Sequence, residues 1–213
     1  MDMGEIMKKT IIILGLLFLA LSVQAQELSI KDLKKMNIVA NSPIKSEDLA
    51  KAQQIMRGVH QKTAEGVKNG KGPFYAELYD ANGNLVVASS NSVVEDKCCI
   101  YHAEVNTLRK AHALYKEYNL APENLTLYVN AEPCIMCAGA IMWSGVKTVY
   151  FGVPSSEVEK ITGFDEGYKP NWINEFKKRG ITVYGNIEQA NGAKVLEDYV
   201  NSGNEIYKPT RGK

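Results

Sequence analysis

The sequence has almost no excess charge, few cysteines and no long apolar run. Each of these features excludes some classes of fold or function. Its 25 basic and 24 acidic side chains leave a formal charge of +1. Proteins that bind a nucleic-acid backbone usually show a basic patch or stripe, and none is visible here. We therefore expect a small-molecule ligand and no nucleic acid. Repeats and low-complexity segments are also absent, so 213 residues suit one globular domain.

The longest apolar stretch runs from Ile11 to Leu21 and follows two lysines. It is shorter than the about 20 residues that a transmembrane helix needs. Val23 and Ala25 place modest side chains at the two positions that signal peptidases read. We therefore expect residues 1–25 to be a signal peptide, the mature chain to be exported to the periplasm or secreted, and no stable membrane insertion to remain. An uncleaved membrane anchor is the alternative.

Only four cysteines are present. In an exported protein, four cysteines would first suggest two disulfides. However, Cys98 and Cys99 are adjacent, which strains a bond between them, and Cys134 and Cys137 have the spacing of metal ligands. A bridge from the first pair to the second would destroy such a metal site. We therefore expect no such disulfide.

Residues 26–45 are mixed in character and are expected to form a loosely packed lead-in, whereas residues 46–213 form the domain. A helical pattern begins at Ser46 and stops at the breaker cluster of residues 69–73. Strands are expected at 74–79, 85–89, 125–129, 147–151 and 181–184, and helices at 102–118, from 133 onward, at 171–179 and at 188–200. Strands that alternate with helices predict a layered α/β fold.

Two short motifs carry the chemistry. His102, Ala103 and Glu104 form a His-x-Glu motif, and Pro133 precedes a Cys-x-x-Cys motif about thirty residues later. Either motif alone would be equivocal, since Cys-x-x-Cys also occurs in redox pairs and structural zinc sites. Together, in this order and at two expected helix starts, they are typical of zinc-dependent deaminases. A closed structural zinc site, or no metal, is the alternative.

The residue types suit a catalytic Zn²⁺ ion. Cys134 and Cys137 are three residues apart, so their sulfurs project from one side of a helix. His102 supplies a neutral nitrogen, and three protein ligands leave one tetrahedral position for water. Zinc can lower the pKa of that water to about 7. Glu104 lies two residues from the histidine and is expected to move protons as the catalytic acid and base.

With these motifs, the sequence resembles the cytidine-deaminase-like superfamily, and within it the bacterial guanine deaminases and nucleoside deaminases. The resemblance covers roughly residues 48–207 and is most specific at residues 102–109 and 132–141. It implies a three-layer α/β/α fold around a mixed five-stranded sheet, and a homodimer.

The same resemblance implies substrate contacts. Asn91 matches an amide that contacts the base, and Glu166, in Gly-Phe-Asp-Glu, matches an acidic residue that contacts the ring NH edge. Tyr207 matches a tyrosine that closes the site, and Trp143 matches a tryptophan that borders the pocket. Ala103 is placed with them as a substrate contact. Each also has a structural alternative: a turn for Asn91, a solvated loop for Glu166, a frayed end for Tyr207 and ordinary core for Trp143.

The resulting hypothesis is hydrolytic deamination of a purine base, with guanine favoured. The alternatives are a deaminase of guanosine, cytosine or another aminated heterocycle, and a zinc-stabilised binding module without turnover. Deamination of tRNA adenosine is disfavoured for an exported, nearly neutral protein, and an exported toxin is a minor alternative because no delivery module is visible.

Overall fold

The computed structural model describes residues 26–207, and the expected signal peptide at residues 1–25 lies outside them. The elements in chain order are β1 (Glu27–Leu28), α2 (Ile30–Lys35), β2 (Val39–Ala40), β3 (Ile44–Lys45), α3 (Ser46–Lys68), β4 (Tyr75–Tyr79), β5 (Leu85–Ser90), α4 (Ala103–Tyr115), η1 (Ala121–Glu123), β6 (Thr126–Ala131), α5 (Ile135–Ser144), β7 (Thr148–Val153), α6 (Ser155–Thr162), α7 (Trp172–Lys178), β8 (Thr182–Gly185) and α8 (Gln189–Asn201). Within the described range, no helix is long and apolar enough to cross a membrane.

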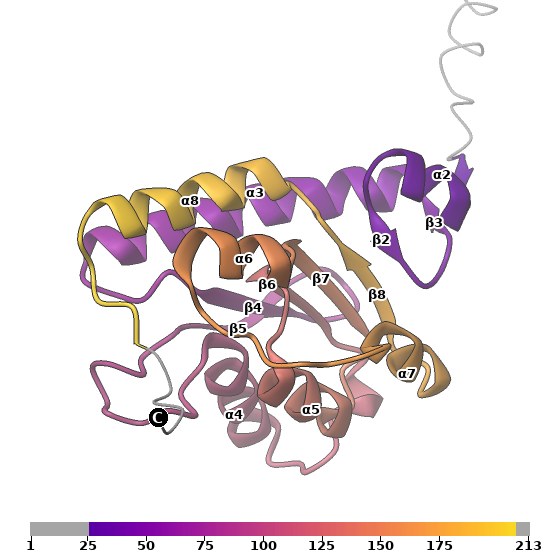
Figure 1. Cartoon of the computed structure of the whole chain (residues 1–213). Helices are drawn as coiled ribbons and strands as arrows, with labels where there is room; N and C mark the ends of the chain where they lie inside the picture. Colours follow the sequence, from indigo (N-terminus) through magenta and orange to yellow (C-terminus); the bar gives the residue numbers. More distant parts are fainter. Residues whose placement is uncertain (1–25, 208–213) are drawn as a thin grey trace, which may run out of the picture.

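A mixed sheet with the strand order β2-β8-β7-β6-β4-β5 forms the middle layer. Strands β6, β7 and β8 run parallel, and β4, β5 and β2 pair antiparallel with their neighbours. Helices α3, α6 and α8 cover one face, and α4, α5 and α7 cover the other (Figure 1). The expected three-layer α/β/α fold is therefore confirmed. The expected number of five strands is wrong by one, because β2 adds a sixth strand at the edge beside β8.

The parallel strands are buried on both faces, and their side chains alternate between two clusters. Leu127 and Val129 of β6 join the core under α4 and α5. Tyr128, which lies between them, joins the cluster under α3. The same alternation holds in β7 and β8, as the two-residue period of a strand requires. All the strands and helices expected from residue 46 onward are present, with ends that differ by a few residues.

Residues 26–45 differ from the expected loosely packed lead-in. Leu33 of α2 is fully buried, Ile38 and Ile44 are each 6% exposed, and the segment supplies the edge strand β2. Its strands are only two residues long, too short to show a hydrophobic period in the sequence. Helix α6 was not among the expected elements. Cys98, Cys99, Cys134 and Cys137 are all free in the structure.

Candidate metal centre and active site

The expected metal ligands lie at the starts of two helices that face each other. His102 is the N-cap of α4, and Cys134 is the N-cap of α5. The first helical residue of α5 is Ile135, two residues after the helix start expected at Pro133. Cys137 occupies the first turn of α5 and is fully buried. Strand β6 ends at Ala131, so the second motif leaves the sheet at the carboxyl end of a parallel strand. Ligand sites are typically built at this end of α/β sheets.

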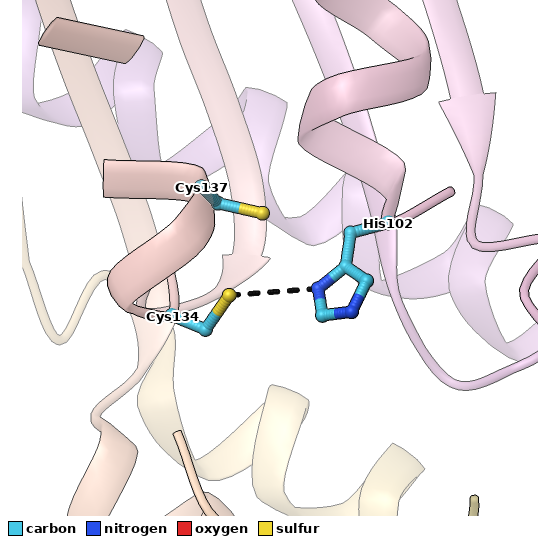
Figure 2. Close-up of side chains that lie close together, drawn as sticks. All are labelled: His102, Cys134 and Cys137. Atoms are coloured by element: carbon cyan, nitrogen blue, oxygen red, sulfur yellow. Dashed lines mark hydrogen bonds between the residues drawn. The ribbon is translucent and has the colours of Figure 1, made fainter. Parts of the chain in front are cut away.

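The three side chains converge on one point (Figure 2). Their ligand atoms lie within 4.8 Å of one another, and the Cys134 Sγ is 3.5 Å from the Nδ1 of His102. Two sulfurs and one imidazole nitrogen form a donor set that binds zinc well. The remaining tetrahedral position is then open to a water molecule, as in a catalytic site.

The ionisation of the Cys134 and Cys137 thiols also suits the binding of a cation. A hydrogen bond from Cys137 lowers the pKa of the Cys134 thiol to about 4, although burial opposes the shift. The same hydrogen bond, together with burial, raises the pKa of Cys137 well above its usual value. Without a metal, the two sulfurs thus share one proton. A divalent ion would replace that proton and hold both sulfurs as thiolates, so the residues present fit the expected Zn²⁺.

Glu104 lies beside the ligands and has the environment of a proton carrier. Its carboxyl group is 6% exposed and lines the same cavity as His102 and Cys134. Burial, followed by the negative charge of Cys134, raises the pKa of Glu104 to about 7. A carboxyl group whose pKa lies near neutral pH can both accept and donate a proton at little cost.

The cavity in front of the metal ligands has a volume of about 440 Å³, a size that accommodates a small ring. Phe74, Phe164 and Tyr207 form an aromatic wall, with Phe164 5.4 Å from Phe74 and 4.9 Å from Tyr207 between ring centroids. The other lining residues are Val93, Cys99, His102, Glu104, Ala131, Glu132, Cys134, Ile135, Asp165, Glu166 and Gly167. Most of the lining is apolar, with carboxyl groups on two sides.

Tyr207 and Asn91 lie beside His102, at the ring nitrogen that does not face Cys134. The Nδ1 of His102 faces Cys134, and its Nε2 forms a hydrogen bond with the Tyr207 hydroxyl at 3.1 Å. The amide of Asn91 donates to the same hydroxyl oxygen at 3.0 Å. With zinc bound at Nδ1, Nε2 would carry the ring hydrogen and also donate to that oxygen, and Tyr207 would keep its own O–H for another acceptor. Tyr207 therefore reaches the site as expected, and Asn91 contacts Tyr207 while lying outside the cavity lining.

Glu166 enters the cavity from the loop that follows α6. It is 8% exposed, and burial followed by the negative charges of Cys134 and Glu104 raises its pKa to about 8. The backbone of this residue is fixed on both sides. Its carbonyl accepts a hydrogen bond from the amide of Ile135 at 3.0 Å, and its amide donates to Glu159 Oε1 at 3.2 Å. Glu166 is therefore held at a defined position facing the metal ligands.

Glu132 ties this loop to the cysteine motif. Its Oε1 accepts from the indole of Trp172 at 2.9 Å and pairs with the ammonium of Lys169 at 3.2 Å. Its Oε2 accepts from the backbone amide of Ser155 at 2.9 Å. The Lys169 side chain is 8% exposed and also donates to the Ser155 hydroxyl. A buried carboxylate with several partners fixes its neighbours in place, so this network restrains both ends of the Glu166 loop.

The comparisons with known proteins agree with this geometry. The family model of the cytidine and deoxycytidylate deaminase zinc-binding region matches residues 49–153. A probable cytosine deaminase from Schizosaccharomyces pombe is 30% identical over 136 residues, which are 64% of this chain and 78% of that protein. The chain belongs to the cytidine and deoxycytidylate deaminase family. It is a hydrolase of C–N bonds with a zinc-binding site.

Other members of this deaminase family act on different substrates. A tRNA-specific adenosine deaminase from Buchnera aphidicola is 32% identical, over 62% of this chain and 82% of that protein. A solved guanine deaminase from Nitrosomonas europaea is 34% identical with a TM-score of 0.65, over 68% of this chain and 81% of that one. A protein solved in complex with 2,6-diaminopurine is also 34% identical, with a TM-score of 0.69, over 73% of this chain and 85% of that one. Similarity alone therefore shows nucleobase deamination but leaves the base open.

Besides Asn91, two of the substrate contacts expected for this deaminase do not line the cavity. Trp143 lies nine residues beyond Cys134, about half a turn out of phase with it on α5, and its side chain is 82% exposed. Ala103 is fully buried in the core under α4. Val93, Cys99 and Ile135 also line the cavity, although they were not among the expected substrate contacts. Ile135 lies within the Cys-x-x-Cys motif, whereas Val93 and Cys99 come from the segment that precedes His102.

Proposed function

We propose that this deaminase hydrolyses guanine to xanthine and ammonia. Glu166 carries the proposal: it is a buried carboxyl group in an apolar cavity, across from Glu104 and the metal ligands. The ring N–H and exocyclic amine of guanine are adjacent donors on one edge. A carboxylate is a matching acceptor for such a pair, and the positive charge of bound zinc, together with these donors, would lower the pKa of Glu166 and favour its ionised form. The similarity to a guanine deaminase and to a diaminopurine complex supports the same choice.

In the proposed reaction, zinc would be held by His102, Cys134 and Cys137 and would supply an activated water. Glu104 takes a proton as the water oxygen adds to the amine-bearing carbon, and it passes that proton to the adjacent ring nitrogen. Glu104 then takes the remaining proton from the added hydroxyl group and delivers it to the departing amine, so that guanine and water become xanthine and ammonia. The pKa of Glu104, raised to about 7 by burial, suits both directions of transfer.

The surrounding residues orient the base for these steps. Glu166 would hold the donor edge of guanine, and the aromatic wall of Phe74, Phe164 and Tyr207 would flank the ring. The hydroxyl group of Tyr207 and the buried amide of Asn91 lie on the same side of His102. The apolar lining removes bulk water, which strengthens hydrogen bonds to the base.

The test is ammonia release by the zinc-loaded protein from guanine, guanosine, adenine, cytosine, cytidine and aminated pterins and triazines. Turnover of guanine in preference to the others is expected. Turnover of cytosine or another heterocycle instead would refute the assignment of Glu166 and keep the deamination. No ammonia from any compound would instead favour the alternative of a zinc-stabilised binding module.

We also propose that the protein is an exported homodimer. Trp143 on α5 and Leu114 on α4 are 82% and 57% exposed, and these two helices pack against each other on one face of the sheet (Figure 1). A second copy would cover these apolar side chains. Sedimentation of the purified protein tests the dimer, and the mass of its N-terminal peptide tests cleavage after Ala25. A monomer, or an intact N-terminus, would contradict the corresponding part.

A further inference from the structure

A second cavity lies at the opposite end of the parallel strands from the metal ligands. It has a volume of about 430 Å³ and lies between the sheet and the start of α3. Strands β6, β7 and β8 begin at this end, with Thr126, Thr148 and Thr182 lining the floor. Part of its rim comes from residues 27 and 43–45, which precede the segment matched by the family model.

The floor of this cavity is a regular array of hydroxyl groups. Thr126, Thr148 and Thr182 are paired in register across the three strands. Two residues further along the same strands, Tyr128, Tyr150 and Tyr184 form a second row. Residues two apart on a strand face the same side of a sheet, so six side-chain hydroxyl groups share one face. This cavity is named the hydroxyl groove below.

The tyrosine row is rigid. The rings of Tyr128 and Tyr150 stack with centroids 4.7 Å apart and planes 6° apart, and those of Tyr150 and Tyr184 stack at 5.0 Å and 21°. Because the ring faces cover one another, each tyrosine can meet a ligand only through its edge and hydroxyl group. The groove therefore recognises hydrogen-bonding groups.

Two of these phenols lack a partner. Tyr184 donates to the carbonyl of Pro43 at 2.8 Å. Tyr128 and Tyr150 are only 5% and 7% exposed, line the groove, and make no side-chain hydrogen bond within residues 26–207. Their hydroxyl oxygens are not among the fully buried unpaired atoms of the described residues, so they open onto the groove, where a ligand can replace the water that solvates them. Burial raises the pKa of both phenols, so they remain neutral donors.

The charges around the groove disfavour an ionic ligand. Lys45 and Lys51 line it together with Glu27, Asp48 and Asp80. Asp80 keeps its negative charge although it is bonded to the backbone of its own turn, and Lys45 also pairs with Glu47 at 3.9 Å, so two cations face three anions in the lining. The Asp48 carboxylate lies near all three tyrosines, since its charge raises the pKa of each. An anion beside the phenols would be repelled by Asp48, and a cation alone could not accept their hydrogens.

We propose that the hydroxyl groove binds a neutral polyhydroxylated ligand, a sugar or sugar-like polyol. Each hydroxyl group of such a ligand can accept from Tyr128 or Tyr150 and donate onward to Asp48. The ligand would contact residues at the amino ends of the strands and none of the metal ligands. Binding there is therefore separate from the proposed guanine deamination.

Saturation-transfer NMR on the whole protein tests the proposal with glucose, ribose and sucrose as neutral probes, citrate as an anion and choline as a cation. At least one of the neutral probes is expected to bind. The double change Tyr128→Phe/Tyr150→Phe keeps the ring stack and removes only the two hydroxyl groups. It should weaken binding by roughly tenfold or more, because each hydrogen bond contributes about 1 kcal/mol.

The control is Tyr115→Phe, which removes a phenol hydroxyl from the other face of the sheet and should leave sugar binding unchanged. Unfolding curves of all variants show whether the fold is kept. Binding of citrate or choline in place of the neutral probes, no binding of any probe, or undiminished sugar binding by the double variant would each overturn the proposal. Deamination by the same samples is read separately, so failure of one assignment leaves the other standing.

Discussion

The two ends of the parallel strands β6, β7 and β8 hold polar groups of opposite character. The carboxyl end holds thiols, a histidine and two carboxyl groups, whose charges depend on one another. The amino end holds the neutral hydroxyl groups of the hydroxyl groove. Both ends are comparably roomy, with cavities of about 440 and 430 Å³, so size does not explain where the chemistry lies.

Helix starts account for the difference. At the carboxyl end, α5 begins with no acidic residue in its first turn, so its positive end is free to stabilise the Cys134 thiolate. At the amino end, the first turn of α3 already contains Glu47 and Asp48, which satisfy its positive end. This difference is between α5 and α3, since α4, the other helix that begins at the metal centre, has Glu104 in its first turn.

The largest effect is expected from removing the proton carrier at the carboxyl end. Glu104→Gln keeps the shape of the side chain but cannot exchange a proton, so kcat on guanine should fall by about 10²–10⁴-fold. Bound zinc, measured by elemental analysis, should be unchanged because Glu104 is not among the metal ligands. Glu117→Gln, an exposed change beyond the end of the same helix, is the control. Unchanged turnover by Glu104→Gln would contradict its role.

A smaller effect is expected at the base-binding side. Glu166→Gln places an amide N–H against the donor edge of guanine, and kcat/KM should fall by about tenfold to a hundredfold, the range of hydrogen bonds to charged groups. Glu197→Gln makes the same change of charge at an exposed position of α8 outside the cavity lining and should leave kcat/KM unchanged. Steady-state kinetics with guanine measure both. Equal effects of the two changes would refute a specific contact by Glu166.

The polar network of Glu132, which supports the Glu166 loop, should affect the deamination rate less and the free energy of unfolding more. Lys169→Met leaves the Glu132 carboxylate mostly buried without its ionic partner, which costs about 3 kcal/mol in comparable pairs. The Glu166 loop should loosen, and kcat/KM should fall by roughly tenfold through misplacement of that carboxylate. Denaturant unfolding and kinetics measure the two effects. Adding Glu132→Gln should recover part of the stability, and a double variant as unstable as the sum of its parts would argue against the network.

The smallest effect on guanine turnover is expected from changes at the amino end of the parallel strands. Tyr128→Phe/Tyr150→Phe should leave kcat/KM for guanine within a factor of about two, since distant sites without shared partners act independently. The measurement is the same ammonia assay. A large loss of turnover with an intact fold would break the comparison, because it would couple the hydroxyl groove to the deaminase site.

The sequence predicted the parts whose chemistry demands particular residues at particular spacings. His102, Cys134 and Cys137 are brought together as their motifs required, and Glu104 lies beside them. The long elements followed from hydrophobic period and breakers, as for α3, which begins at Ser46 as expected. These features are local, so a single stretch of sequence contains the information.

The features that the sequence did not predict depend on contacts between distant segments. The six hydroxyl groups of the groove lie in one array only because three strands pair in a particular register. Residues 26–45 are ordered through packing against α3 and pairing with β8, not through their own pattern. Trp143 was placed at the pocket by resemblance, whereas the helical period turns it to the outside of α5.

The most direct test of the account is guanine turnover by the same protein before metal removal, after removal with a chelator, and after zinc is added back. The account predicts that ammonia release is lost on removal and restored by zinc, because His102, Cys134 and Cys137 hold the ion that activates the water. Full turnover by the metal-free protein would contradict it.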